Sequence, residues 1–311
     1  MLKKIVFMGT PLFAVPILKS LYQNGYPISV VYTRPPQKSH RGQKINKSAI
    51  QNISETLNLE FRAPSLLKNN NEEYEFLKKH DADIAIVVAY GQIIPKEFLS
   101  LTKKGFINIH ASLLPKWRGA APIQRSIINL DKETGISIMK IEEKLDAGPV
   151  CNNYKIEIKH NDNNETMSEK LSLLAAEKIL DNIDDILEDK IEFKEQNHDE
   201  ATYAPKITKM EGKINWNESA ENIVGKIKGL YPSPGAWFIY RGERYKILKA
   251  EIGSSSERIG EVTNDYLEIT CNNKKTIKVL EIQRQGKRPQ NIGEFILGSK
   301  IKKGFNMNNN E

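Results

Sequence analysis

The sequence predicts the α/β fold class, with a doubly wound parallel sheet followed by a second, smaller β domain. Three observations support this prediction. The chain has 311 residues, more than one simple core usually holds. Its first half alternates short β-rich runs with helical patterns, as βαβ units do. Its last third holds five short strand candidates separated by turn residues, which is typical of a small β-barrel.

The alternation in the first half predicts a series of strands and helices. Predicted strands cover residues 5–7, 28–32, 84–89, 106–110 and 135–141, and predicted helices cover 13–23, 48–57 and 72–79. The run at 84–89 is almost wholly apolar, as expected of a strand buried on both faces of a parallel sheet. Ligands of such a sheet bind beyond the carboxyl ends of its strands.

The clearest predicted helix covers residues 166–187. Thr166 and Glu169 have the spacing of a capping box at its start. Its apolar face consists of Met167, Leu171, Leu174, Ile179, Ile183, Ile186 and Leu187. The polar stretch after it predicts a linker at 191–212, between domains at 1–190 and 213–311. The second domain has a predicted helix at 220–230 and predicted strands at 236–240, 245–250, 259–262, 267–270 and 277–282.

Composition and cysteine usage exclude several classes of protein. With 39% hydrophobic and 27% charged residues, the chain is typical of a globular protein. No apolar run approaches the ~20 residues of a membrane helix, so no membrane association is expected. Cys151 and Cys271 lie far apart without a CxxC pair, which argues against a disulfide framework or a zinc site. We therefore expect a cytoplasmic protein that needs no metal.

Positive charge is concentrated at the two ends of the chain, whose formal net charge is +7. Residues 1–54 contain eight Lys or Arg and no acidic residue. Residues 206–311 contain 19 basic and 12 acidic residues, whereas residues 55–205 contain 19 basic and 27 acidic ones. This segregation favours a polyanionic partner, because neutralising phosphates releases counterions. The alternative is a generally lysine-rich composition.

The first predicted strand is followed by Gly9-Thr10-Pro11, where a nucleotide-binding fingerprint is expected in this type of sheet. The pattern GxGxxG is absent there, and so is the phosphate loop GxxxxGK[ST]. The sequence therefore argues against binding of a dinucleotide or ATP in the usual way.

Asn108 and His110 end an apolar predicted strand, and Pro115 prevents the ladder from continuing much further. Strand alternation puts both side chains on one face of the sheet. An amide and an imidazole at the carboxyl end of a strand form a pair of hydrogen-bond donors where a ligand is expected. The alternative is a structural pair that bridges loop backbone. The other four histidines lie in charged surroundings that favour solvation.

Asp146 follows the predicted strand at 135–141 and precedes Ala147-Gly148-Pro149. On its own, an aspartate before small residues is usually a turn residue. In combination with His110, it predicts a carboxylate that meets the imidazole across neighbouring loops.

The segment from Asn108 to Gln124, NIHASLLPKWRGAAPIQ, resembles the signature of the methionyl-tRNA formyltransferases. Its core NxHxSLLP, and Leu145-Asp146-Ala147-Gly148, are similar to motifs of the wider family that uses 10-formyltetrahydrofolate. That family includes the glycinamide ribonucleotide and sugar-nucleotide formyltransferases. The resemblance extends over essentially the whole chain, and it implies a Rossmann-like first domain and an OB-like barrel as the second.

The resemblance implies a role for each matching residue. Asn108, His110 and Asp146 match the catalytic residues, with the first two donating to the oxyanion while Asp146 orients the imidazole and relays a proton. Residues matching the folate site are Ser112, Leu113, Leu114, Pro115, Gly91, Gln92, Ile93, Ile94, Glu142 and Leu145. For Leu113, Leu114, Ile93 and Ile94, ordinary core packing is the alternative. The formyl donor would be 10-formyltetrahydrofolate, with no metal.

A loop after the second predicted strand carries five basic residues and no acidic one: Arg34, Lys38, Arg41, Lys44 and Lys47. In family members that formylate initiator methionyl-tRNA, an insertion at this place enters the acceptor arm, so the resemblance implies tRNA binding here. A solvated loop is the alternative. A second basic region comprises Lys246, Lys249, Lys274, Lys275, Lys278, Arg284, Lys287 and Arg288.

The expected protein is thus a monomeric enzyme that formylates initiator methionyl-tRNA. Three alternatives remain: formylation of a sugar-nucleotide amine, an RNA-binding module without catalysis, and hydrolysis of formylfolate to formate.

Overall fold

The computed structural model describes residues 3–39, 44–299 and 301–309. The chain forms two compact units. The first comprises the described residues of Met1–Gly119, Thr134–Ile156 and Ser168–Tyr203, and the second comprises those of Ala120–Glu133, Glu157–Met167 and Ala204–Glu311. The domain division at residues 191–212 stays a prediction. Within the described residues, no helix is both long and apolar enough to cross a membrane.

The first unit is built on a seven-stranded sheet with the order β10-β9-β7-β6-β1-β2-β5. The strands are β1 (Ile5–Gly9), β2 (Ile28–Tyr32), β5 (Phe61–Arg62), β6 (Ile84–Val88), β7 (Phe106–His110), β9 (Glu133–Lys140) and β10 (Val150–Glu157). The pairs from β5 to β7 are all parallel, as predicted. The predicted strands at 28–32 and 106–110 have the observed bounds.

β9 is an exception to the parallel pairing, because it runs antiparallel to β7 and pairs Ser137 with His110. A parallel strand requires a crossover that returns the chain to the opposite edge of the sheet. The helix between β7 and β9, α5 (Pro122–Ile128), belongs to the second unit and makes no such crossover. β9 therefore starts near the carboxyl end of β7 and runs back alongside it.

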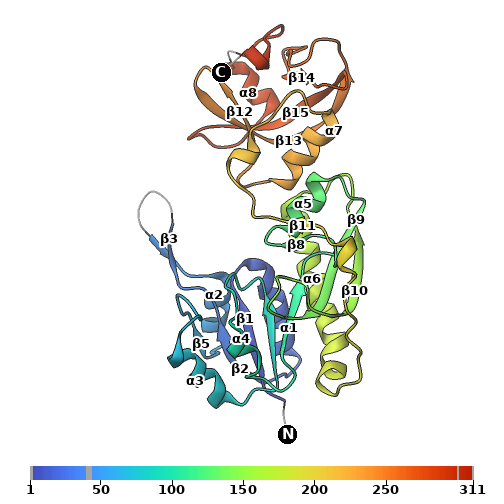
Figure 1. Cartoon of the computed structure of the whole chain (residues 1–311). Helices are drawn as coiled ribbons and strands as arrows, with labels where there is room; N and C mark the ends of the chain where they lie inside the picture. Colours follow the sequence, from blue (N-terminus) through green and yellow to red (C-terminus); the bar gives the residue numbers. More distant parts are fainter. Residues whose placement is uncertain (1–2, 40–43, 300, 310–311) are drawn as a thin grey trace. The chain divides into compact units, whose positions relative to one another are not determined.

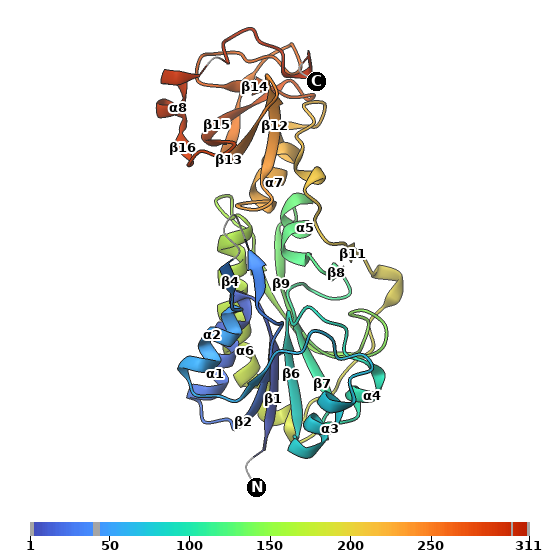
Figure 2. The same cartoon turned by 90° about the vertical axis from the view of Figure 1, so that its left-hand side faces the viewer.

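Helices cover both faces of this sheet, which confirms the doubly wound arrangement (Figures 1 and 2). On one face, α1 (Val15–Gln23) lies beside α6 (Asn164–Leu187), and the Ser20 hydroxyl donates to the Ala176 carbonyl at 3.0 Å. On the other face, α3 (Asn71–His80) and α4 (Lys96–Leu99) bury Leu77 and Phe98 against β1, β2 and β6. A further helix, α2 (Ala49–Thr56), begins at the N-cap Ser48.

The start of α6 differs from the prediction. The reciprocal cap joins Asn163 and Thr166, each backbone N–H donating to the other's side-chain oxygen at 3.0 Å. The predicted capping box of Thr166 and Glu169 is therefore wrong. An asparagine that can accept the amide of the residue three positions later starts the helix earlier.

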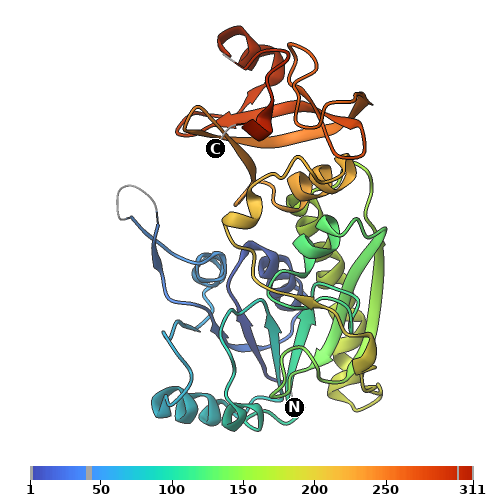
Figure 3. The same ribbon diagram turned by 45° about the horizontal axis from the view of Figure 1, so that its top comes forward.

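The second unit contains an antiparallel sheet with the order β12-β13-β15-β14, and a short strand β16 also pairs with β15. Figure 3 shows the ribbon of this sheet, in orange and red, from another direction. The strands are β12 (Ala236–Tyr240), β13 (Glu243–Ser255), β14 (Glu268–Thr270), β15 (Lys275–Arg284) and β16 (Gln290–Asn291). The predicted strand at 259–262 forms only the isolated bridges Glu261–Asn306 and Val262–Ile269. The predicted strand is not formed because the two adjacent bridges go to different segments, one on each side, so no continuous ladder develops.

Two helices pack in the second unit through closely approaching backbones. α7 (Ala220–Gly229) contacts β13 and β15, and α5 packs on its other side. A Cβ at Gly225 would lie 2.6 Å from Leu130, and one at Gly229 would lie 2.6 Å from Ile128. At Gly229 a Cβ would also lie 2.9 Å from the backbone oxygen of Gln124, so glycine permits the close approach there. A third helix, α8 (Ile292–Gly298), contributes Phe295 to the core.

Candidate active site

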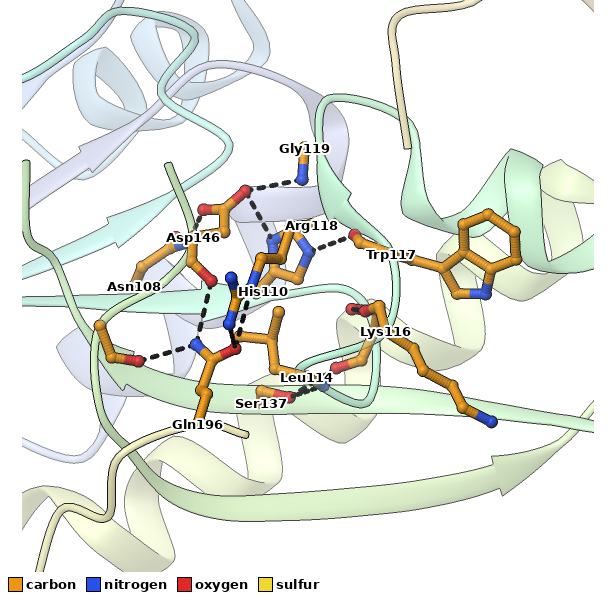
Figure 4. Close-up of polar contacts among 12 residues, drawn as sticks. Asn108, His110, Leu114, Lys116, Trp117, Arg118, Gly119, Ser137, Asp146 and Gln196 are labelled. Atoms are coloured by element: carbon orange, nitrogen blue, oxygen red, sulfur yellow. Dashed lines mark hydrogen bonds and ion pairs between the residues drawn. The ribbon is translucent and has the colours of Figure 1, made fainter. Parts of the chain in front are cut away.

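The carboxyl end of β7 carries Asn108 and His110, whose side chains point to the same side (Figure 4). Asn108 is half-buried, and the His110 side chain is only 7% exposed. β7 lies between β6 and β9, so its backbone is held on both sides. The sheet therefore presents an amide and an imidazole from a rigid element.

Asp146 approaches both side chains from the loop after β9. Its Oδ2 atom lies 3.7 Å from His110 Nδ1, and its Oδ1 atom lies 3.5 Å from Asn108 Nδ2. The Gly119 amide also donates to Oδ2 at 2.8 Å. Asp146 has a φ of 47°, in the left-handed region that aspartate tolerates better than most residues. The structure thus brings the three predicted catalytic side chains together.

The second ring nitrogen of His110 defines the tautomer. Nε2 lies 2.9 Å from the Trp117 carbonyl oxygen, which can only accept a hydrogen bond. Nε2 therefore carries a proton, and Nδ1 is the nitrogen that faces Asp146. The Trp117 indole points away from the cluster (Figure 4).

A second layer of polar contacts surrounds this cluster and is formed by residues outside the predicted site. The buried Arg118 guanidinium donates to Gln196 Oε1 from Nε at 3.0 Å and from Nη2 at 2.7 Å. Gln196 Nε2 in turn donates to the carbonyl oxygens of Asp146 at 2.9 Å and Gly148 at 2.7 Å. Gln196 falls in the predicted linker, and no local pattern marks it as buried.

The predicted folate loop, Ser112 to Pro115, is pinned by hydrogen bonds. The Ser112 hydroxyl donates to the Lys116 carbonyl at 2.6 Å, and the Leu114 amide donates to Ser137 Oγ at 2.9 Å. Leu114 is buried, as the core-packing alternative expects. Leu113 covers Gly135, where a Cβ would lie 2.5 Å from its side chain.

The other residues predicted to bind folate divide into buried and exposed ones. Ile94 packs against the apolar core under β6, whereas Ile93 is 87% exposed. Gln92 Nε2 donates to the Pro64 carbonyl at 2.8 Å, while its buried Oε1 has no hydrogen-bond partner among the described residues. Leu145 is 67% exposed, and the neighbouring Gly91 and Glu142 are exposed as well. Core packing therefore accounts for Ile94 and does not account for Ile93 or Leu145.

The basic loop contains a hairpin of β3 (Gln37–Ser39) and β4 (Lys44–Asn46), which extends away from the sheet (Figure 1). Lys38 and Lys44 lie on its strands, and Arg41 lies outside the described residues. Lys47 pairs with Glu55 at 2.7 Å. Arg34 is half-buried, with its Cδ 3.2 Å from the Cβ position of Gly91. Of the five predicted cations, Arg34 is thus half-buried and Lys47 forms an ion pair.

Comparison with known families covers most of the chain. Residues 3–183 match the family described as formyl transferase, and residues 206–300 match the formyl transferase C-terminal domain. Among solved structures, HypX from Aquifex aeolicus in complex with tetrahydrofolic acid has a TM-score of 0.66 at 14% identity, covering 96% of this chain and 47% of that one. WlaRD, a sugar 3N-formyl transferase, has a TM-score of 0.67 at 18% identity, covering 93% and 100%. At these identities, the two structures show the fold alone.

Relatives with higher identity have one shared description. The methionyl-tRNA formyltransferase of Pelagibacter ubique (strain HTCC1062) is 68% identical over 309 residues, covering 99% of this chain and 100% of the relative. That of Thermodesulfovibrio yellowstonii (strain ATCC 51303 / DSM 11347 / YP87) is 42% identical over 302 residues, covering 97% of each. The chain therefore belongs to the formyl transferase family, within the methionyl-tRNA formyltransferases.

Proposed function

We propose that this enzyme transfers the formyl group of 10-formyltetrahydrofolate to the α-amino group of initiator methionyl-tRNA, and that Asn108, His110 and Asp146 perform the chemistry. Family membership supports the reaction. The observation that carries the residue roles is the convergence of an amide, an imidazole and a carboxylate, with the imidazole and the amide 3.7 Å and 3.5 Å from the carboxylate.

The main difficulty of this reaction is the weak electrophile. The attacking α-amino group has an ordinary pKa near ~8, so a neutral fraction is available without a strong base. The formyl carbon, held on an amide-like nitrogen, must instead be polarised. Asn108 Nδ2 and a protonated His110 Nδ1 both lie farther from Asp146 than the about 2.7–3.2 Å of an ordinary hydrogen bond. Both donors are therefore free to turn to an oxyanion, and each such donor is worth about 10²–10³ in rate.

Asp146 supplies charge and proton transfer. Its carboxylate stabilises the imidazolium, and the Gly119 amide fixes its orientation. The amine nitrogen forms a bond to the formyl carbon while the carbonyl π electrons move to oxygen. Collapse of this tetrahedral intermediate expels the folate nitrogen, which takes up the proton that the amine has lost. Asp146 relays that proton, directly or through water, a contribution of about 10²–10⁴.

Two groups of residues support binding of the folate. Ile93 and Leu145 offer exposed apolar side chains to a flat heterocycle, and the unpartnered Oε1 of Gln92 offers an acceptor to its N–H groups. The remaining folate residues are Gly91, Ile94, Ser112, Leu113, Leu114, Pro115 and Glu142. Because Ile93 and Leu145 are exposed in the free protein, both apolar side chains are available to a ligand.

For the tRNA, we propose that Arg34, Lys38, Arg41, Lys44 and Lys47 contact phosphates. In the second basic region, Lys274, Lys275, Lys278 and Arg284 each pair with a glutamate. Lys287 and Arg288 line a cavity of about 1010 Å³ together with Arg241, and no ion pair joins either residue to a carboxylate among the described residues. Unpaired cations contribute most to phosphate binding, because they release counterions without losing an existing partner.

Several finer features complete the proposal. The second unit closes as an OB-like barrel, supported by its long strand β13 with register shifts that bend it. The enzyme acts as a monomer in the cytoplasm and uses no metal.

The test is incubation with 10-formyltetrahydrofolate and charged initiator or elongator methionyl-tRNA, followed by quantification of formyl-methionine. We expect rapid formylation of the initiator tRNA. Formate released without tRNA would indicate hydrolysis instead, and formylation of a sugar-nucleotide amine would indicate the other transferase class. Absence of folate turnover with every acceptor would refute the proposed reaction.

A further inference from the structure

We infer that Gln196, oriented by Arg118, is a positioning residue that holds Asp146 in place against His110. This inference rests on the proposed function. Gln196 and Arg118 do not touch the reacting atoms; they act through the backbone of the loop that carries the carboxylate (Figure 4).

The carboxamide of Gln196 uses its full hydrogen-bonding capacity. Its amide group has two N–H donors, which are directed to the carbonyls of Asp146 and Gly148. Its oxygen accepts two hydrogen bonds, both from the Arg118 guanidinium. A flipped carboxamide would place its N–H groups against the guanidinium and its oxygen against two carbonyls. Only one orientation is therefore compatible with these neighbours.

The two carbonyls lie at a boundary in the loop. Residues 142–145, before Asp146, are exposed, whereas Ala147, Gly148 and Pro149 after it are buried. A Cβ at Gly148 would lie 2.2 Å from the Lys140 carbonyl, so this part of the loop packs tightly on the end of β9. Asp146, which has a left-handed backbone conformation, joins the exposed part of the loop to its packed part. The Gln196 amide group binds the Asp146 carbonyl and so holds it next to the packed part.

The same segment of chain also holds the imidazole side of the site. The Trp117 amide donates to Thr202 Oγ1 at 2.9 Å, and the Arg118 amide donates to the Thr202 carbonyl at 2.8 Å. Trp117 is the residue whose carbonyl accepts the His110 Nε2 hydrogen bond. Residues 196–202 therefore contact the Asp146 loop at one end and the His110 loop at the other, which fixes the separation of the two.

Burial makes this arrangement selective for glutamine. Arg118 is 4% exposed and Gln196 is 8% exposed, so water does not readily replace a missing partner. Glutamate at position 196 would keep the acceptors for Arg118 but would direct an oxygen at two carbonyl oxygens. The expected result is a displaced Asp146 loop in a folded protein. A displacement of about 1 Å in a reacting group typically costs about 10²-fold in rate.

The test compares Gln196→Glu, Gln196→Met and wild type in formylation of charged initiator methionyl-tRNA. We expect both variants to lower kcat by about 10²-fold, with KM for tRNA and for the formyl donor within about twofold of wild type. Gln23→Glu makes the same charge change at an exposed residue at the end of α1, and should leave kcat unchanged.

A double-mutant cycle separates positioning from a general structural role. If Gln196 acts through Asp146, then Gln196→Glu should change kcat less than about threefold in an Asp146→Asn background. A similar 10²-fold loss in both backgrounds, or a loss below tenfold in the wild-type background for both variants, overturns the inference. A wild-type enzyme that does not formylate methionyl-tRNA would instead overturn the proposed function.

Discussion

Replacing Asp146 by asparagine removes one charge from the site while keeping the size of the side chain. Three donors face the carboxylate: the Gly119 amide, Asn108 Nδ2 and His110 Nδ1. An asparagine offers only one acceptor oxygen. Placing its NH₂ group toward Gly119 would set two donors 2.8 Å apart, so the oxygen should stay there and the NH₂ group should face Asn108. The Gly119 contact is then kept, and the counter-charge of the imidazolium is lost.

The distance in the structure sets the magnitude of the effect. Two unit charges 3.7 Å apart interact by about 4 kcal/mol at an effective dielectric constant of about 20. Because about 1.4 kcal/mol corresponds to a tenfold change in rate, kcat should fall by about 10³-fold. Binding of tetrahydrofolate should change less than threefold, since the residues proposed to contact it are unaltered.

The assay measures single-turnover formylation of initiator methionyl-tRNA together with calorimetric binding of tetrahydrofolate. Asp265→Asn, at an exposed position in the second unit, is the matched control and should behave as wild type. If Asp146→Asn retains turnover within tenfold of wild type while folate binding is intact, the electrostatic role of Asp146 is refuted.

Three further results are expected. Leu145→Ser should raise KM for the formyl donor by about tenfold through the loss of apolar contact area. The thermal midpoint should not change, because Leu145 is 67% exposed in the free protein. An unchanged KM would remove Leu145 from the folate site. Arg288→Ala should weaken tRNA binding and reduce the slope of log affinity against log salt by about 1. Lys275→Ala should reduce that slope less, because Lys275 already pairs with Glu221. Equal slopes for the two variants would contradict this reasoning. Burial raises the pKa of Glu268, but hydrogen bonds from Thr276, Ser254 and Asn264 outweigh burial and hold that pKa below its usual value. The stability that Glu268 contributes is therefore present above its unfolded pKa and lost as pH falls through the lower folded pKa. Glu268→Gln should lower the unfolding free energy by about 1–3 kcal/mol at neutral pH, and the unfolding free energy of this variant should fall less in acid than that of wild type. Denaturant titrations at several pH values would measure both effects. An identical pH dependence of the two proteins would contradict this role of Glu268.

Local patterns in the sequence were sufficient for most of the secondary structure in the first unit. The strands at 28–32 and 106–110, and a helix within 48–57, follow from apolar periodicity within a few residues. The direction of β9 does not, because it depends on whether the intervening helix packs as a crossover. The predicted strand at 259–262 failed for a related reason: its two bridges go to different segments, and the fold decides which segments pair.

By itself, the sequence determined the α/β class, the placement of Asn108 and His110 on one face of a strand, and, by resemblance, the family. These follow from the period of two along a strand and from contiguous motifs. Only the tertiary structure decided how far Asp146 lies from the imidazole and which residues hold it there. Arg118 and Gln196 are 78 residues apart along the chain, and Gln196 lies 50 residues from Asp146. Hydrogen bonds between such distant residues depend on how the loops pack, which no local pattern encodes.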